Sequence, residues 1–162
     1  FVLLRLKNKL NLNRYFVIIL SFFIFEIIFN LYKYHPFQSV YFNNLVSSDM
    51  KKNFEVDTQS LSRVEAIKDI LRDSKKANNI TIGTASWTPL ENGRSLIKKD
   101  YWYRLNFTGT SNKVNVDYIY TNYYYEVNPI FAKKYKIPEN FKLLKTLTID
   151  NTHIYSIYKK NH

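Results

Sequence analysis

The sequence predicts an α/β protein in which an N-terminal transmembrane helix precedes a small α/β domain with a mixed sheet. The first observation is an apolar stretch at 15–32 that contains no Gly, Pro or basic residue. The second is an alternation of helical and strand patterns from about residue 54 onward. The third is size, since 162 residues with 46% hydrophobic content suffice for one domain with a buried core.

The apolar stretch is long enough to cross a bilayer as a helix. Its 18 residues extend about 27 Å at a rise of about 1.5 Å each, near the hydrocarbon thickness. Thirteen of them are Phe, Ile, Leu or Val, and their insertion gains roughly 4–8 kcal/mol against about 3 kcal/mol for Glu26. A membrane span is the preferred interpretation. A secretory signal peptide is disfavoured because bulky residues follow at 32–35, and a buried soluble helix is the other alternative.

Basic residues before the helix predict its orientation. Arg5, Lys7, Lys9 and Arg14 precede the span, so the positive-inside rule places them in the cytoplasm, at the inner or cell membrane. The expected organisation is a basic cytoplasmic segment at 1–14, a transmembrane helix at 15–34, an interfacial connector at 35–53, and an extracytoplasmic (periplasmic) α/β domain at 54–162.

The start of the sequence indicates either a processing site or a longer chain, because the first residue is Phe1 rather than Met. Residues 1–4 are apolar and could be the end of a preceding transmembrane helix, with 5–14 as a short cytoplasmic turn. An amphipathic lead-in to the membrane helix is the alternative.

One face of the membrane helix is polar. Glu26, Asn30 and Lys33 are spaced four and three residues apart, so they share a helical face. Polar side chains in a span normally face neighbouring helices rather than lipid. We therefore expect Glu26 and Asn30 to pack against other membrane helices; a proton or ion role for Glu26 is the alternative. Pro36 should end the helix near Tyr34.

The first part of the α/β domain should contain one helix and one strand. Ser62 and Glu65 form the capping-box pattern at the start of a helix that runs to about Lys76. Its buried stripe is expected to consist of Val64, Ile67, Ile70 and Leu71. A short strand at 80–85 follows the helix.

The second part should complete the sheet. Residues 87–107 read as a loop with one helical turn, and 113–122 as a strand because apolar residues alternate there. A short helix is expected at 129–135. Strands at 141–149 and 153–159 are joined by Asp150 and Asn151, which are typical of turns. Strands separated by helices predict a partly parallel sheet closed by an antiparallel edge pair.

The composition limits the classes of binding partner that the chain is expected to have. The net charge of +11 and pI near 9.7 raise the question of nucleic acid or an anionic surface. However, the lysines are dispersed in pairs and no nucleic-acid motif occurs, so we expect no nucleic-acid partner and keep basic nucleic-acid binding as a third option. The absence of Cys excludes disulfides and thiolate zinc sites.

Few residues carry visible chemistry. No nucleotide-binding, metalloprotease or nucleophile-elbow motif occurs. His35, His153 and His162 lack metal-ligand spacing, so no metal site is expected, and no cofactor is assigned. Glu55 and Asp57 are two apart, so on a strand they would share one face and could bind a hydroxyl-rich ligand or a cation; a solvated strand face is the alternative. The tyrosines at 123–125 could stack on sugars.

Three segments resemble motifs of one enzyme family. Tyr34-His35-Pro36-Phe37-Gln38-Ser39-Val40-Tyr41-Phe42-Asn43 is similar to the HPYQxVYFN signature that follows the last membrane helix of certain bacterial GT-C fold glycosyltransferases, relatives of the dolichyl-phosphate-mannose protein mannosyltransferases. Phe54-Glu55-Val56-Asp57, with Leu61-Ser62 and Glu65-Ala66, resembles their FExDYWGLSxKEA run, and Asp117-Tyr118-Ile119 with Thr121-Asn122-Tyr123 resembles their DYVxTNY strand. The chain departs from the family where Thr58-Gln59-Ser60 stand for Tyr-Trp-Gly and Ser47-Ser48 for a Gly pair.

The resemblance implies the C-terminal part of an integral membrane glycosyltransferase that moves a sugar from a polyprenyl phosphate carrier to an acceptor. It covers about residues 14–160, and it implies that the catalytic carboxylate lies in an upstream loop, so no catalytic residue is expected here. The expected partners are membrane lipid, the upstream transmembrane bundle and the polyprenyl-linked sugar. The alternative is a membrane-anchored extracytoplasmic module that binds a glycan or a protein. Glu55 and Asp57 are the expected contacts with the acceptor or between domains. The signature residues expected to dock the domain on the bundle are Tyr34, His35, Pro36, Gln38, Tyr41, Phe42 and Asn43.

Overall fold

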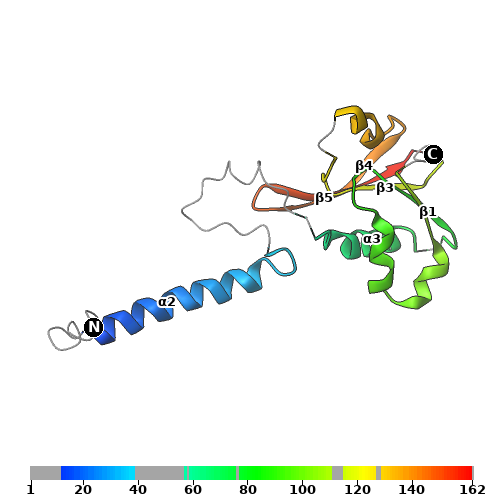
Figure 1. Ribbon diagram of the computed structural model, residues 1–162. Coiled ribbons are helices and arrows are strands. Elements are labelled where there is room, and N and C mark those ends of the chain that lie inside the picture. Colours follow the sequence, from blue (N-terminus) through cyan, green and yellow to red (C-terminus); the bar gives the residue numbers. More distant parts are fainter. Residues whose placement is uncertain are drawn as a thin grey trace. The chain divides into compact units, whose positions relative to one another are not determined.

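The structure is a computed structural model that describes residues 12–38, 57, 59–75, 77–110, 115–126 and 129–161. The chain divides into two compact units, Phe1–Tyr41 and Phe42–His162. Figure 1 follows the chain through both units.

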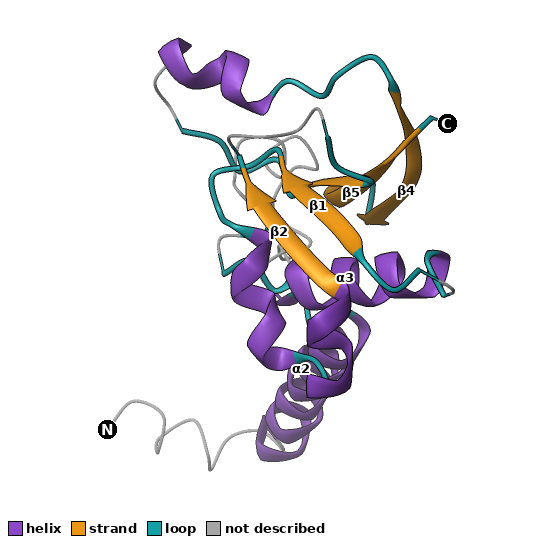
Figure 2. Ribbon diagram, turned by 90° about the vertical axis from the view of Figure 1, so that its right-hand side faces the viewer, coloured by secondary structure: helices purple, strands orange, loops and turns teal. Residues whose placement is uncertain are grey.

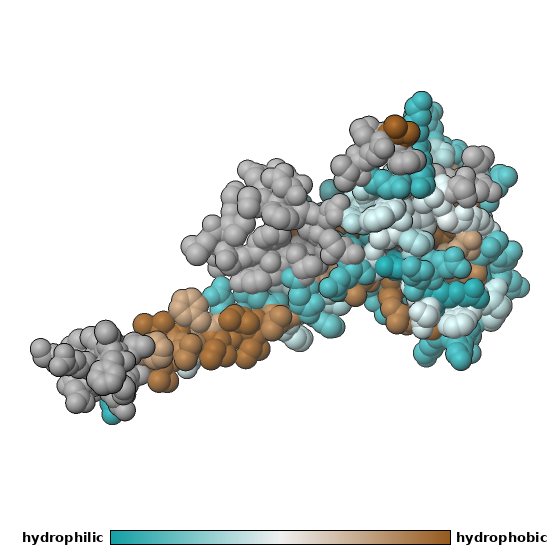
Figure 3. All heavy atoms as spheres, viewed as in Figure 1, coloured by the Kyte–Doolittle hydropathy of each residue, from teal (hydrophilic) through white to brown (hydrophobic). Residues whose placement is uncertain are grey.

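The first unit contains one long helix, α2 (Leu12–Lys33). Most of its apolar side chains are exposed, and Figure 3 shows the helix as a largely hydrophobic rod. Its part Arg14–Lys33 is long and apolar enough to cross a membrane by length and composition. The helix ends at Lys33, one residue before the expected end, and a turn with a cis peptide bond between His35 and Pro36 follows.

The second unit is built on a five-stranded mixed sheet, which confirms the predicted α/β class. The strands are β1 (Ile80–Thr84), β2 (Leu105–Gly109), β3 (Tyr118–Thr121), β4 (Phe141–Ile149) and β5 (Thr152–Lys160). They lie in the order β2-β1-β3-β5-β4. Strand β1 pairs in parallel with both β2 and β3, whereas β5 pairs antiparallel with β3 and β4. Figure 2 shows β1 and β2 pointing the same way.

One face of the sheet is covered by helix α3 (Ser62–Asp73), which packs against β5 and against the 3-10 helix η3 (Leu90–Leu96). Of the predicted stripe on α3, Ile67 and Ile70 are completely buried, whereas Val64 and Leu71 are only half-buried. Ala66 and Asp69 are also buried on this helix. The interface therefore contains a carboxylate that the hydrophobic pattern did not predict.

The other face of the sheet has its own apolar cluster. Ala85, Val116, Ile119 and Phe141 are buried together, with Ile137 and Tyr158 packed around them. All four residues of β3 are buried, because a central strand has a covered layer on each side. Burial therefore does not alternate along β3, although alternation was the signal that predicted the strand at 113–122. Within the described part of that range, the strand has four residues.

The predicted capping box at the start of α3 is wrong. The N-cap position is Leu61, which has no side-chain capping bond, and Ser62 is the first helical residue. The Ser62 hydroxyl points inward to Asp57, and Glu65 forms an ion pair with Lys68 at 2.6 Å. The backbone N–H of Ser62 donates to Asp57 Oδ1 at 3.3 Å instead, so Asp57 supplies the acceptor that the capping pattern assigned to Ser62. The helix also ends at Asp73 rather than near Lys76.

The region between β1 and β3 differs most from prediction. The expected loop at 87–107 forms two 3-10 helices, η3 and η4 (Lys99–Arg104), and β2 was not predicted at all. This edge strand has five residues, of which only Leu105 is buried. By contrast, the short helix expected at 129–135 is the 3-10 helix η5 (Pro129–Tyr135).

The antiparallel hairpin of β4 and β5 is confirmed. Its turn residues Asp150 and Asn151 have φ of 46° and 62°. Positive φ at both central positions is the conformation that two-residue hairpin loops need, and Asn and Asp tolerate it better than other residues with a side chain.

Candidate functional site at the carboxyl ends of the parallel strands

The candidate site lies where the chain changes direction along the sheet. From β1 the chain continues through η3 and η4 to β2 on one side, and from β3 it continues through η5 to the β4–β5 hairpin on the other. The segments that leave the carboxyl ends of β1 and β3 therefore diverge. In open α/β sheets, this switch point is where ligands bind.

Asp57 is the centre of a polar cluster at this edge, which we call the switch-point cluster: the buried residues Asp57, Ser62, Tyr120 and Asn122, with the half-buried Thr88. Only 4% of Asp57 is exposed. Its Oδ2 accepts hydrogen bonds from the Ser62 hydroxyl and, at 3.0 Å, from Asn122 Nδ2. With the Ser62 N–H on Oδ1, three donors surround one carboxylate.

The cluster continues to both strands. The Ser62 hydroxyl has one proton, which Asp57 accepts, so the Tyr120 hydroxyl at 2.6 Å donates to Ser62 Oγ. The second amide proton of Asn122 goes to Thr88 Oγ1 at 3.1 Å. Asn122 therefore connects the segment after β3 to the segment after β1, and Asp57 fixes both to the start of α3.

Burial raises the pKa of the Tyr120 hydroxyl, and the neighbouring Asp57 charge raises it further. The phenol therefore stays protonated at physiological pH and remains a donor. The arrangement can hold one carboxylate rigidly at the carboxyl edge of the sheet. The Ser62 hydroxyl donates to the Asp57 carboxylate and accepts from Tyr120, so it is engaged on both sides within the cluster.

An aromatic pair borders the cluster. Trp87 is 52% exposed, and its ring lies 5.2 Å from that of Tyr124 at 37°. The backbone N–H of Trp87 also donates to the backbone carbonyl of Tyr124 at 2.7 Å, and this bond holds the two segments together. An exposed indole next to polar groups can stack on a ligand while the polar groups orient it. Sequence reasoning missed Trp87, although its position just after the predicted strand at 80–85 was a signal.

The three consecutive tyrosines are each engaged within the domain. Tyr123 contacts Ser156 through its hydroxyl and His153 through its ring. Tyr124 contacts Trp87, as described above, and Tyr125 lies 5.2 Å from the Tyr135 ring. They do not form one continuous stacking surface, and only Tyr125 is exposed, at 40%.

Glu55 and Asp57 were expected to share one strand face, with a solvated face as the alternative. Glu55 lies outside the described residues. Asp57 is in a turn rather than on a strand, and it is buried. The strand geometry and the solvated alternative are therefore both wrong for Asp57. Its carboxylate is buried because it accepts hydrogen bonds from Ser62, at the start of α3, and from Asn122.

The predicted docking residues are partly described. Tyr34 is buried and His35 is exposed. Gln38 Nε2 lies 3.1 Å from His35 Nδ1, and it also approaches the Leu31 carbonyl at 3.5 Å. Pro36 follows the cis bond. Three further expected residues lie outside the described part: Tyr41, Phe42 and Asn43.

The polar face expected on the membrane helix is present on α2. Glu26 and Asn30 lie within the same helix, and both are less exposed than most of the apolar residues around them. Within the described residues, no group of three or more His, Asp or Glu side chains could hold a metal ion.

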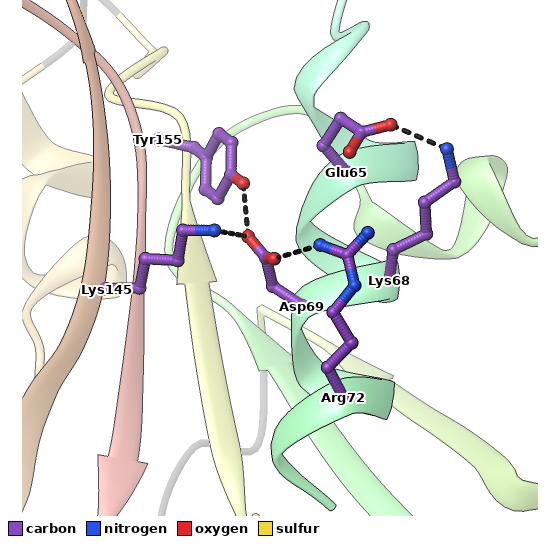
Figure 4. A network of polar contacts seen from close by, with 6 residues as sticks. All are labelled: Glu65, Lys68, Asp69, Arg72, Lys145 and Tyr155. Carbon is purple, nitrogen blue, oxygen red and sulfur yellow. Dashed lines mark hydrogen bonds and ion pairs between the residues drawn. The ribbon is translucent and has the colours of Figure 1, made fainter.

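A second polar network lies between α3 and the hairpin, and Figure 4 shows it. Asp69 stands between Lys145 and Tyr155 on one side and Arg72 on the other. Burial alone would raise the pKa of the Asp69 carboxyl, but hydrogen bonds from Lys145 and Tyr155 and the nearby charges outweigh it and lower the pKa. This network fixes the helix to the sheet, and it adjoins the switch-point cluster because the Tyr155 ring lies 6.3 Å from the Tyr120 ring.

Comparison with protein-family models, with curated proteins and with solved structures finds no match for this chain.

Proposed function

We propose that the chain is the C-terminal part of an integral membrane glycosyltransferase that transfers a sugar from a polyprenyl phosphate carrier to an acceptor. In this proposal the catalytic carboxylate lies upstream, and the α/β domain contributes to acceptor binding or to contact between domains. One observation carries the proposal. Asp57 and Asn122, which belong to two separate motifs of the family resemblance, are 65 positions apart and joined by a hydrogen bond of 3.0 Å.

The proposal assigns a role to each part of the site. Asp57 is a positioning residue that holds Asn122 and the start of α3. Trp87 is the exposed ring on which a sugar or another acceptor group would stack. Glu55 remains an expected acceptor or interdomain contact. Residues 34–43 dock the domain on the upstream bundle, and Glu26 and Asn30 pack against its helices.

The proposal also includes localisation. Helix α2 would span the inner or cell membrane with its N-terminus in the cytoplasm, which leaves the α/β domain outside. Because the chain contains no Cys, single cysteines report topology without background. We expect a membrane-impermeant maleimide to label Asn92→Cys in intact spheroplasts and to label Lys9→Cys only after lysis. The reverse pattern would overturn the orientation.

Upstream sequence is the most direct test of the enzyme proposal. We expect the reading frame to continue upstream of Phe1 through several hydrophobic spans. An in-frame stop codon with a nearby start, and no spans before Phe1, would overturn it. If the spans are present, membranes with the extended protein should transfer label from polyprenyl phosphate hexoses. Trp87→Ala should then raise KM for the acceptor, whereas Leu143→Ala on exposed β4 should not.

A second candidate is a membrane-anchored module that binds a glycan or a protein without catalysis. It is favoured by one observation, that Phe42–His162 forms a compact unit with apolar clusters on both sheet faces. Carbohydrate binding by the full chain in nanodiscs, together with a stop codon upstream, would support this candidate over the enzyme.

A further inference from the structure

The segment between β1 and β2 has large apolar side chains exposed on its surface. Leu96 is 69% exposed and Tyr103 is 76% exposed. Both flank the segment where η3 ends and η4 begins, and the exposed side chains of Lys98, Lys99 and Asp100, with one net positive charge, lie between them. Apolar and amphipathic aromatic side chains next to lysines are the composition of surfaces that contact the headgroup region of a bilayer.

A basic pocket adjoins this segment. It has a volume of about 320 Å³ and lies between α3 and η4. Its lining contains four cations and no carboxylate: Lys68, Arg72, Lys75 and Arg104, together with Leu71 and Tyr101. Lys68, Leu71 and Arg72 are spaced three and four residues apart and share one face of α3, whereas Lys75 lies two residues beyond the end of this helix. Tyr101 and Arg104 are three apart on η4. Two of these cations form ion pairs with carboxylates outside the lining, Lys68 with Glu65 at 2.6 Å and Arg72 with Asp69 at 2.9 Å. Lys75 and Arg104 are the lining cations whose charge suits a phosphate group.

The segment is held firmly against the domain. The Trp102 indole N–H donates to the Ile97 carbonyl at 3.3 Å, and the Arg94 guanidinium lies 5.2 Å from the Trp102 ring. Arg104 donates to the carbonyls of Ser74 and Ala77 at 2.6 and 2.9 Å, at the end of α3. The exposed side chains therefore belong to a segment whose backbone is held in place by these contacts.

A bilayer is the occupant that fits this surface. Helix α2 is apolar and long enough to cross one, and 23 residues, 34–56, separate its end at Lys33 from Asp57. Those residues extend at most about 80 Å. If α2 spans, the surface therefore stays within reach of headgroups at a high effective concentration. Its cations complement the negative charge of anionic phospholipid headgroups, and neutral lipids carry no such net charge.

We propose that residues 96–104 and the adjoining basic pocket form a docking surface for a bilayer that contains anionic phospholipid. The pocket receives a headgroup phosphate, and Leu96 and Tyr103 enter the interfacial region. This inference rests on the proposed membrane span of α2, and it is independent of the sugar-transfer reaction.

The test uses the full chain in nanodiscs made from phosphatidylcholine, with or without phosphatidylglycerol. Leu96→Cys carries an environment-sensitive fluorophore, and Asn151→Cys in the β4–β5 turn carries the same label as the control. We expect spin-labelled lipid to quench the label at 96 about twofold or more strongly when phosphatidylglycerol is present, and the label at 151 hardly at all. Inorganic phosphate added to phosphatidylcholine nanodiscs should not produce this quenching, because a free anion does not attract the surface to the bilayer.

A pair of variants with equal changes in net charge tests whether the lysines of this surface cause the quenching. Lys98→Glu with Lys99→Glu should abolish most of the extra quenching, whereas Lys133→Glu with Lys134→Glu on η5 changes the net charge equally and should leave it. Equal quenching at 96 and 151, equal loss in both charge variants, or DNA retention by this surface without lipid quenching would overturn the proposal. Failure of the chain to enter nanodiscs would overturn the span itself, and with it the docking surface, whereas absence of sugar transfer would leave this measurement unchanged.

Discussion

The hydroxyl of Tyr155 donates a hydrogen bond of 2.6 Å to Oδ2 of Asp69 across the interface between α3 and the sheet. Lys145 approaches the same oxygen at 2.7 Å, and Arg72 approaches the other at 2.9 Å. Both Asp69 and Tyr155 are buried. One carboxylate therefore connects α3 to β4 and to β5, as drawn in Figure 4.

The Asp69–Tyr155 bond should contribute measurably to stability. We expect Tyr155→Phe to lower the free energy of unfolding by about 1–3 kcal/mol, since it removes a donor from a buried carboxylate. Tyr158→Phe is the matched control, because its hydroxyl has no hydrogen-bond partner among the described residues. Urea unfolding of the full chain in nanodiscs, followed by fluorescence, measures both. Equal losses for the two variants would contradict this role.

Stability should fall in acid because of Asp69 and Asp73. For both carboxyls, burial alone would raise the pKa. In Asp69, hydrogen bonds from Lys145 and Tyr155 and the Lys145 charge lower the pKa instead. In Asp73, hydrogen bonds from Lys159 and Tyr118 and the Lys159 charge do the same. A lowered folded-state pKa stabilises the fold above the unfolded-state value near 4 and loses this contribution as the pH falls below it.

The variant that tests this pH dependence is Asp69→Asn. It should be less stable at neutral pH and should lose less stability than the wild type between about pH 5 and pH 3. Glu91→Gln, at an exposed position on η3, should retain the wild-type slope. Parallel acid profiles for the wild type and Asp69→Asn would show that Asp69 does not carry the effect.

Asp57 should be needed for folding as well as for the proposed function. Asp57→Ala leaves the Ser62 hydroxyl and one Asn122 amide proton without their acceptor, so we expect a loss of about 2–4 kcal/mol. Asp100→Ala, at an exposed position on η4, removes an equal charge and should change stability little. Thermal unfolding of the full chain gives the comparison. A negligible effect of Asp57→Ala would remove the cluster from the structural account.

The contact between η3 and α3 depends on a missing side chain. A Cβ added at Gly93 would lie 2.9 Å from Arg63 Cβ and 3.1 Å from Ile67 Cδ1. Arg63 Cβ cannot move without its backbone, so Gly93→Ala should cost about 1–3 kcal/mol through overpacking.

Gly109 provides the contrast for this prediction. It has φ of 63° and open space around the position of a Cβ. Gly109→Ala should therefore cost about 1 kcal/mol through backbone strain alone, and Gly109→Asn should cost less because Asn tolerates this conformation. If Asn rescued Gly93 in the same way, steric contact would not be the cause there.

The predicted elements that proved correct are those with strong local signals. Helix α2 follows from one apolar run, and the β4–β5 hairpin follows from alternating strands around Asp150 and Asn151. The start of α3 was located correctly, but for the wrong reason. The acceptor for the Ser62 N–H comes from Asp57, five residues earlier, and no capping pattern includes that position.

The missed features depend on tertiary structure. Strand β2 is short, contains Asn106 and Gly109, and exists because β1 offers it a parallel partner. The meeting of Asp57 with Asn122 depends on how the sheet is ordered, which local periodicity does not encode. The family resemblance selected both residues without indicating that they touch. The exposure of Trp87 likewise follows from the divergence of two loops.

The switch-point cluster also imposes an order on biosynthesis. The ribosome makes Asp57 and Ser62 65 and 60 residues, respectively, before Asn122, so α3 emerges while its carboxylate acceptor still lacks the amide that will bind it. The carboxyl edge of the sheet can close only after translation has passed β3. A nascent chain arrested before that point should consequently expose this edge to proteases and chaperones.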